Sequence, residues 1–214
     1  MINRKIEAIL FDFDGTIADT SEDMVGCLNI LLKNHSKEDV DIRKAKNFIS
    51  KGAAGLINFA FPKISDEEKK LYISEYLEIY KNNLYIKTKL FSGIEELILS
   101  IVKKQYKWGI VTNKPSYLVN PIIKKINFFY SPNCVVAGDT LSVKKPNPEP
   151  LIYAAKIIGC DPSLCAYVGD DIRDITAANS AGMISVAALY GFIEDLQQVK
   201  ELSLIHISEP TRLL

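Results

Sequence analysis

Residues 8–20, AILFDFDGTIADT, decide the fold class of this chain. Their first part, Ala8–Phe13, is a short apolar run that ends in acidic residues and glycine, which predicts a buried parallel strand followed by a loop. Similar short apolar runs recur at Trp108–Thr112, Cys134–Ala137, Ala166–Gly169 and Ile184–Ala188. Helical patterns lie between them at 94–102, 150–158 and 172–181. This alternation predicts an α/β fold with a doubly wound parallel sheet.

Residues 18–85 behave differently, because they show helical patterns without an intervening strand. Thr20 with Asp23, and Ser65 with Glu68, have the spacing of capping boxes at helix starts. We therefore expect an all-helical insert at 18–85, directly after the first strand. The α/β core would then consist of residues 1–17 and 86–201.

The last segment, 202–214, stands apart from this scheme. Its first eleven residues, LSLIHISEPTR, read as the translation of a nucleotide run that looks like a transposase sequencing adapter. We expect this tail to be non-native and leave it out of the fold prediction. A natural amphipathic ending is the alternative, and resequencing the source locus decides between the two. If the tail is foreign, His206 is an artefact and His35 is the remaining histidine.

Composition narrows the class of partner. Lys and Arg together number 26, as do Asp and Glu, so no net charge draws the chain to nucleic acid or to an anionic membrane. A small neutral or anionic molecule is the better partner. We expect a cytoplasmic protein, because the first residues are too charged for a signal peptide and no run approaches the ~20 apolar residues of a membrane span. The sequence does not indicate an oligomeric state. The sequence contains no CxxC pair that would indicate a zinc site or a redox pair. We therefore expect reduced core thiols at Cys27, Cys134, Cys160 and Cys165.

Polar clusters follow the predicted strands, at the carboxyl ends where open parallel sheets bind ligands. Asp12 and Asp14 are two residues apart, so both carboxylates project to the same side of an extended strand. Their repulsion favours a nearby cation, and Asp170 supplies a third acid that suits Mg²⁺. Thr112 can hydrogen-bond a phosphoryl oxygen, and a lysine at 144 or 145 can offset its charge. Together these residues indicate phosphoryl transfer.

Each cluster alone is a weak indication, since a DxD pair or a Gly-Asp pair is often only a turn. Their order along the chain strengthens the prediction. A serine or cysteine hydrolase would need His35, inside the helical insert, as its base, whereas a carboxylate nucleophile needs no histidine. A catalytically silent binding protein is a further alternative, and the complete set of acids argues against it.

The ordered motifs FDFDGTIADT (11–20), VTNKP (111–115), KKPNPEP (144–150) and GDDIRD (169–174) resemble those of the haloacid dehalogenase superfamily, in the subgroup with a helical cap after the first strand. The resemblance implies a Rossmann-like core in which Asp12 attacks phosphorus. Asp14 would protonate the leaving oxygen and then activate water. Thr112 and Lys145 would hold the phosphoryl group, Lys145 matching the family lysine better than Lys144.

The same resemblance implies a Mg²⁺ site formed by Asp12, the backbone carbonyl of Asp14 and Asp170. Asp174 and Asn113 are expected to support these residues from behind, and Asp171 to be a solvent-facing or supporting acid. Lys114 is expected only to shape its loop. The expected substrate contacts are Thr16 in the core and Lys51 and Gly52 in the cap loop.

The acid at position 14 favours phosphate esters over dehalogenation or phosphonate cleavage, according to the family pattern. Residues 137–183 and 186–193 resemble bacterial phosphoglycolate phosphatases, with N-acetylmuramic acid 6-phosphate phosphatases as the alternative. Pyrophosphatase and β-phosphoglucomutase-like activities remain open on the same residues. The non-enzyme alternative is a receiver-like module that accepts phosphate on aspartate, against which the acid at 14 and the long helical insert argue.

Overall fold

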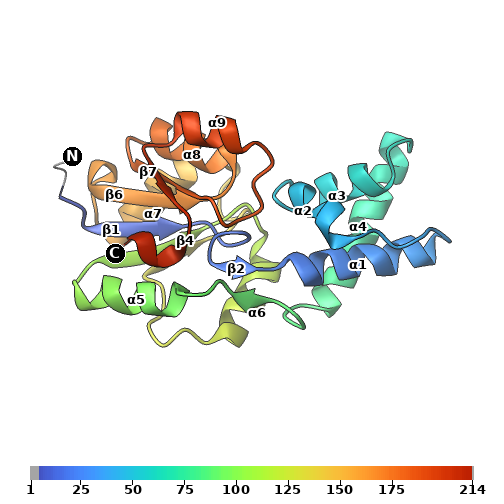
Figure 1. Cartoon of the computed structure of the whole chain (residues 1–214), viewed down its shortest axis with the longest axis horizontal. Helices are drawn as coiled ribbons and strands as arrows, with labels where there is room; N and C mark the ends of the chain where they lie inside the picture. Colours follow the sequence, from blue (N-terminus) through green and yellow to red (C-terminus); the bar gives the residue numbers. More distant parts are fainter. Residues whose placement is uncertain (1–4, 214) are drawn as a thin grey trace. The chain divides into compact units, whose positions relative to one another are not determined.

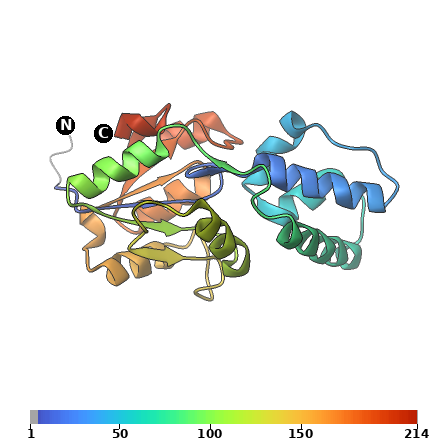
Figure 2. The same cartoon turned by 90° about the horizontal axis from the view of Figure 1, so that it is seen from below.

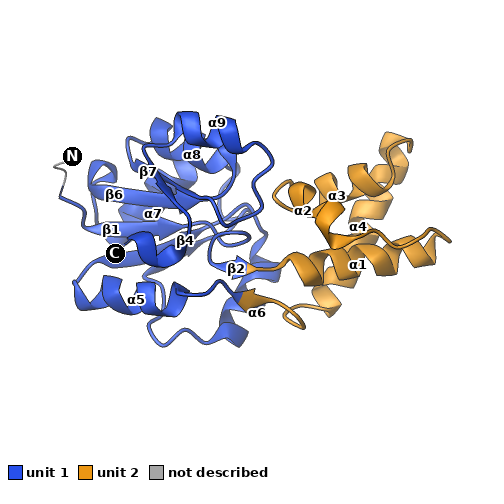
Figure 3. Cartoon of the chain, viewed as in Figure 1, with its two compact units in different colours: residues 1–18, 90–214 blue, residues 19–89 orange. Residues whose placement is uncertain are grey.

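The computed structural model describes residues 5–213 and divides the chain into two compact units, Met1–Ala18 with Leu90–Leu214, and Asp19–Lys89 (Figure 3). The first unit carries the main sheet and is called the α/β unit here. The second carries four helices and is called the helical unit. The chain passes between them at β2 (Ala18–Asp19) and β3 (Lys89–Leu90), which pair as a two-stranded sheet.

The main sheet of the α/β unit has six strands in the order β5-β4-β1-β6-β7-β8, and the pairs along it are parallel (Figure 1). The strand at its centre, β1 (Ala8–Phe11), lies between β4 (Lys107–Val111) and β6 (Cys165–Gly169). β5 (Cys134–Val136), β7 (Ile184–Ala188) and β8 (Ile205–Ile207) complete it. The parallel doubly wound sheet predicted from the sequence is confirmed.

Helices cover both faces of this sheet, so its strands are buried on both sides. On one face, α7 (Glu149–Ile158) and α8 (Ile172–Ser180) bury Leu151 and Ala177 against Leu10 and Tyr167. The other face is covered by α5 (Ile94–Lys103), which packs beside β4 (Figure 2). α6 (Ser116–Ile126) follows β4, and a short 3-10 helix, η1 (Pro162–Leu164), precedes β6. β1 itself is buried throughout, and polar residues follow its carboxyl end.

The helical unit contains α1 (Ser21–Asn34), α2 (Ile42–Ile49), α3 (Gly52–Ala60) and α4 (Asp66–Asn82). The capping box predicted at Ser65 and Glu68 is confirmed at the start of α4. The one predicted at Thr20 and Asp23 is wrong, since Thr20 makes no side-chain cap hydrogen bond. The Asp23 carboxylate instead accepts hydrogen bonds from residues 86–88, at the other end of the unit.

Residues 202–213 are folded onto the edge of the sheet. After α9 (Leu196–Leu202), β8 pairs with β7 and buries Ile207, and η2 (Pro210–Leu213) follows. The fold prediction from the sequence does not include this segment. The alternating Ile205-His206-Ile207 pattern explains its place, because one face of the strand is apolar. The foreign origin of the segment stays a prediction.

The described chain also bears on the predictions about membrane spans and cysteines. Within residues 5–213, no helix combines the length and the apolar character needed to cross a membrane. The cysteines are free thiols, as predicted; Cys27, Cys134 and Cys165 are buried and Cys160 is partly exposed.

Candidate active site

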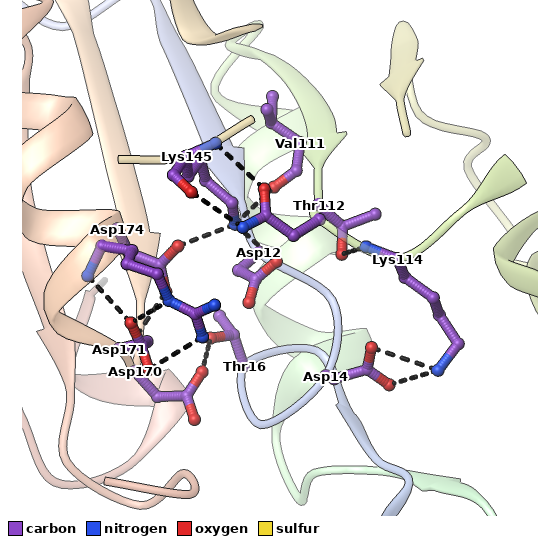
Figure 4. Close-up of polar contacts among 12 residues, drawn as sticks. Asp12, Asp14, Thr16, Val111, Thr112, Lys114, Lys145, Asp170, Asp171 and Asp174 are labelled. Carbon is purple, nitrogen blue, oxygen red and sulfur yellow. Dashed lines mark hydrogen bonds and ion pairs between the residues drawn. The ribbon is translucent and has the colours of Figure 1, made fainter. Parts of the chain in front are cut away.

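The predicted site residues of the α/β unit lie at the carboxyl ends of neighbouring strands (Figure 4). Asp12 follows β1, Thr112 follows β4 and Asp170 follows β6, and these three strands are adjacent in the sheet. Lys145 comes from the loop between β5 and α7. Parallel strands end at the same edge, so residues more than a hundred positions apart in the sequence meet there.

Lys145 lies at the centre of this group, with its ammonium buried. Its Nζ is 2.8 Å from Asp12 Oδ1 and 2.7 Å from Asp174 Oδ1. Burial alone would lower the pKa of Lys145, but the charges of Asp12 and Asp174 outweigh it and raise the pKa. Lys145 therefore stays charged and ties the acid after β1 to the acid on α8.

Tyr167, on β6, is a member of this network that sequence reasoning missed. Its hydroxyl donates to the carbonyl oxygen of Val111 at 2.7 Å and accepts from Lys145 Nζ, also at 2.7 Å. Lys145 Nζ also lies 3.1 Å from the carbonyl oxygen of Val111, so four oxygens, from Asp12, Asp174, Tyr167 and Val111, surround its three N–H groups. Burial, and then the neighbouring carboxylates, raise the pKa of Tyr167 well above its ordinary value, so the hydroxyl keeps its proton.

Asp170 is fully buried, and each of its carboxylate oxygens has a fixed partner. Thr16 Oγ1 donates to Oδ1 at 3.0 Å, and the backbone N–H of Phe192 donates to Oδ2 at 2.7 Å. Two glycines make room for this carboxyl group. A Cβ on Gly15, whose φ is +85°, would lie 2.1 Å from Asp170 Oδ2, and one on Gly191 would lie 2.4 Å from Asp170 Cβ.

Thr16 was predicted to contact substrate. In the structure its hydroxyl donates a hydrogen bond to Asp170. A substrate contact of Thr16 therefore stays a prediction. The loop 190–192 was not predicted to be part of the site. Its contribution comes from a backbone N–H and from the absence of a side chain on glycine, neither of which a motif of polar residues reveals.

The acids of the site can hold a metal ion. Asp12, Asp170 and Asp174 each offer a carboxylate oxygen, and the three oxygens lie within 4.8 Å of one another. Burial, followed by the charge of Asp12, raises the pKa of Asp170 well above its ordinary value. Burial also raises the pKa of Asp174 to about 7, although Lys145 opposes the shift. Three neighbouring carboxyl groups outnumber the one ammonium that pairs with two of them, and hard oxygen ligands of this kind fit a divalent cation such as Mg²⁺.

Asp14 lies apart from these acids and has a different lysine. Lys114 Nζ is 2.9 Å from Asp14 Oδ1 and 3.2 Å from Asp14 Oδ2. Figure 4 shows the Asp14 carboxylate directed at Lys114 and away from the group around Lys145. Sequence reasoning assigned Lys114 only to the shape of its loop, because nothing in the local pattern shows where a long side chain ends.

Asn113 holds the loop that carries Lys145. Its Nδ2 donates to the backbone carbonyl of Lys145 and its Oδ1 accepts from the backbone N–H of the same residue, both at 3.0 Å. These two hydrogen bonds place Asn113 behind the site. Thr112 is buried, and its Oγ1 accepts from the N–H of Lys114 at 3.2 Å.

Asp174 is held from two sides, since its Oδ2 accepts from the backbone N–H of Asp171 at 3.1 Å while Oδ1 pairs with Lys145. Asp171 caps α8 and forms an ion pair with Arg173, whose Nε is 2.7 Å from Asp171 Oδ1. Asp171 is therefore a supporting acid at the start of α8. Lys51 and Gly52 lie in the helical unit, where α3 begins, so their contact with substrate stays a prediction.

The comparison with known proteins decides the family. A family model described as haloacid dehalogenase-like hydrolase matches residues 9–188. The chain belongs to this family. The resemblance drawn from its four motifs is thereby confirmed.

Relatives within the haloacid dehalogenase-like hydrolases carry two different names. The phosphoglycolate phosphatase of Xanthomonas campestris pv. campestris (strain 8004) is 37% identical over 185 residues, which cover 86% of this chain and 84% of that protein. The N-acetylmuramic acid 6-phosphate phosphatase of Pseudomonas aeruginosa is 32% identical, covering 90% of this chain and 86% of that protein.

A solved structure supports the fold. It is described as a predicted phosphoglycolate phosphatase from Haemophilus somnus 129PT, and it superposes with a TM-score of 0.87 at 24% identity. The match covers 97% of this chain and 96% of that one.

Proposed function

We propose that this chain is a Mg²⁺-dependent hydrolase of small phosphomonoesters that works through an aspartyl phosphate on Asp12. The observation that carries the proposal is the separation of the two acids of the DxD motif. Asp12 pairs with Lys145 in a buried acidic cluster, whereas Asp14 pairs with Lys114. Two carboxylates in different surroundings can serve one as the nucleophile and the other as the acid–base group. The two successive steps of ester hydrolysis require both roles.

In the first step, a carboxylate oxygen of Asp12 attacks phosphorus while the bond from phosphorus to the ester oxygen breaks. The ester oxygen keeps the electron pair and takes a proton from the Asp14 carboxyl group. In the second step, Asp14 accepts a proton from water as the water oxygen attacks the phosphorus of the aspartyl phosphate. Inorganic phosphate leaves and the Asp12 carboxylate is restored.

The remaining residues hold the phosphoryl group and limit its motion. Lys145 offsets its charge and Thr112 donates a hydrogen bond to it. A Mg²⁺ ion held by Asp12, the carbonyl of Asp14 and Asp170 would supply further positive charge at the phosphoryl oxygens. Asp174, Asn113 and Tyr167 keep Lys145 and its loop in place through the contacts given above.

For the substrate, we propose phosphoglycolate first, because the relative from Xanthomonas campestris with that name is 37% identical, against 35% for an N-acetylmuramic acid 6-phosphate phosphatase of Pseudomonas putida. N-acetylmuramic acid 6-phosphate is the second candidate, supported by the relative from Pseudomonas aeruginosa. We infer that the helical unit acts as the cap that selects between them and that Lys51 and Gly52 face the substrate. Both candidates are anionic acids, so a lysine contact alone does not separate them.

We place the activity in the cytoplasm, since four free thiols are typical of a reducing compartment. The partner of the protein in this proposal is a small phosphate ester.

The proposal is tested by assaying phosphate release with Mg²⁺ from phosphoglycolate, N-acetylmuramic acid 6-phosphate, pyrophosphate and hexose phosphates. We expect turnover of one of the first two, and a loss of at least about 10³-fold in kcat for Asp12→Asn, since the nucleophile is removed. Asp161→Asn is the matched control, because Asp161 is an exposed cap of η1 outside the site.

Unchanged hydrolysis by Asp12→Asn would contradict the mechanism. Turnover of pyrophosphate or isomerisation of a hexose phosphate alone would replace the proposed substrate. Stable phosphorylation of the protein without turnover would favour a receiver-like module.

A further inference from the structure

Lys114 and Asp14 form a partly buried ion pair, to which the proposed mechanism gives no role. The Lys114 side chain is 4% exposed and that of Asp14 is 17% exposed. Nζ lies within 3.2 Å of both carboxylate oxygens, so the contact restrains the rotation of the carboxylate as well as its position. A lysine so deeply buried is costly unless a partner offsets its charge, and here the partner is the acid of the DxD motif.

The backbone of Lys114 is anchored on both sides. Its N–H donates to Thr112 Oγ1 at 3.2 Å, and its carbonyl oxygen accepts from the N–H of Gly138 at 2.9 Å. The loop is closely packed there, since a Cβ on Gly138 would lie 2.1 Å from the carbonyl oxygen of Asn113. Lys114 therefore reaches Asp14 from a fixed base that also carries the predicted phosphate ligand Thr112.

We propose that Lys114 is a positioning residue for Asp14, which it holds at the angle needed for proton transfer. The inference rests on the proposed function, in which Asp14 gives a proton to the ester oxygen and later takes one from water. One carboxylate oxygen can stay on Lys114 while the other faces the reacting oxygen. The two lysines then have parallel roles: Lys145 fixes Asp12 and Lys114 fixes Asp14, so the two carboxylates stay separated.

This role predicts a dependence on the leaving group. Proton transfer matters when the departing oxygen is strongly basic, as in an alkyl phosphate, and matters little when it is a stabilised phenolate. Loss of the Lys114 ammonium should therefore slow alkyl phosphates selectively. A lysine that merely stabilised the fold would affect both kinds of ester alike.

The experiment compares Lys114→Met with the unsubstituted protein on two esters, 2,4-dinitrophenyl phosphate and phosphoglycolate, with N-acetylmuramic acid 6-phosphate in place of the latter if phosphoglycolate is not turned over. The quantity is kcat/KM, which reports the steps up to the first irreversible one and so leaves out hydrolysis of the aspartyl phosphate. We expect a loss of about 100-fold on the alkyl ester and less than about threefold on the dinitrophenyl ester.

Both esters are assayed on the same preparation, so a fraction of unfolded protein lowers the two values equally and cancels in their ratio. Lys114→Gln serves as a second variant and should change the ratio in the same direction. In an Asp14→Asn background, Lys114→Met should change the ratio by less than about twofold, because the group through which it acts is already gone.

Equal losses on both esters would overturn the inference, as would a full additional effect of Lys114→Met in the Asp14→Asn background. The proposed function fails separately, if the unsubstituted protein turns over neither ester or if Asp12→Asn retains full activity.

Discussion

Asp12 and Asp174 pair with the ammonium of Lys145, and Asp170 lies close to both acids; the crowding of these three carboxyl groups governs how the site responds to pH. The pKa of Asp174 is raised to about 7 from an ordinary 3.8, with burial as the main cause. Below the ordinary value the group is protonated in the folded and the unfolded chain alike. Between 3.8 and about 7 the unfolded chain releases this proton while the folded metal-free protein still holds it, so the stability from this group falls as pH rises and is lost above about 7.

A divalent cation should reverse that loss, since it neutralises the ionised acids. We predict that Mg²⁺ raises the melting temperature of the chelator-treated protein more at about pH 8 than at about pH 5, where protons compete for the same oxygens. Thermal denaturation with and without Mg²⁺ at both pH values measures the difference. Asp170→Asn should shrink the effect of Mg²⁺ at the higher pH. An equal effect of Mg²⁺ at both pH values would refute the prediction.

At the scale of single residues, the acids of the site could be predicted from the sequence, but the residues that hold them in place could not all be predicted. Asp12, Asp170 and Lys145 could be predicted because each lies in a short motif after a predicted strand. Lys114 and Tyr167 could not, because their importance depends on where a side chain ends in space, and Tyr167 looks like any apolar residue of a buried strand.

At the scale of single elements, Asp23 joins the two ends of the helical unit. From α1 its carboxylate accepts the backbone N–H groups of Ile86, Lys87 and Thr88 at 2.7–3.0 Å, together with the Thr88 hydroxyl at 2.6 Å. Asp23 is buried, so removal of the carboxylate leaves several donors without an acceptor.

Asp23→Ala should therefore lower the free energy of unfolding by about 3 kcal/mol, because hydrogen bonds to a charged group are lost and buried donors are left behind. Urea denaturation followed by circular dichroism measures this. Asp39→Ala is the matched control: its ion pair with Lys33 is exposed, and we expect a change of less than about 1 kcal/mol. Similar losses for the two variants would show that Asp23 is not the tie between the ends of the unit.

The elements themselves were predicted with uneven success, for identifiable reasons. Short apolar runs identified β1, β4, β5, β6 and β7 to within one or two residues at each end, because strands buried on both faces leave a continuous apolar signature. The Ser65 capping box was predicted because both of its partners lie within one helical turn. Thr20 and Asp23 have the same spacing, but Asp23 is drawn to residues more than sixty positions away, which a local pattern does not show.

For the whole molecule, the sequence predicted the division into an α/β core and a helical insert, and the structure forms an α/β unit and a helical unit. We propose that the helical unit is the cap of the enzyme and that residues 202–214 are foreign to it. Within this segment, β8 extends the sheet beyond β7, and pairing at an open sheet edge requires little of a sequence beyond alternation of apolar and polar residues. Fold and family therefore follow from residues 9–188 whatever the origin of the tail.

The central claim is that Asp12 becomes phosphorylated during turnover. It is tested most directly by acid-quenching the protein with Mg²⁺ and substrate within milliseconds, followed by mass spectrometry of its peptides. We predict one added phosphoryl group on the peptide that contains Asp12, absent from Asp12→Asn and more abundant in Asp14→Asn, which forms the aspartyl phosphate from 2,4-dinitrophenyl phosphate but hydrolyses it slowly. Phosphate release without any phosphorylated Asp12 peptide, in the unsubstituted protein and in Asp14→Asn alike, would contradict the account.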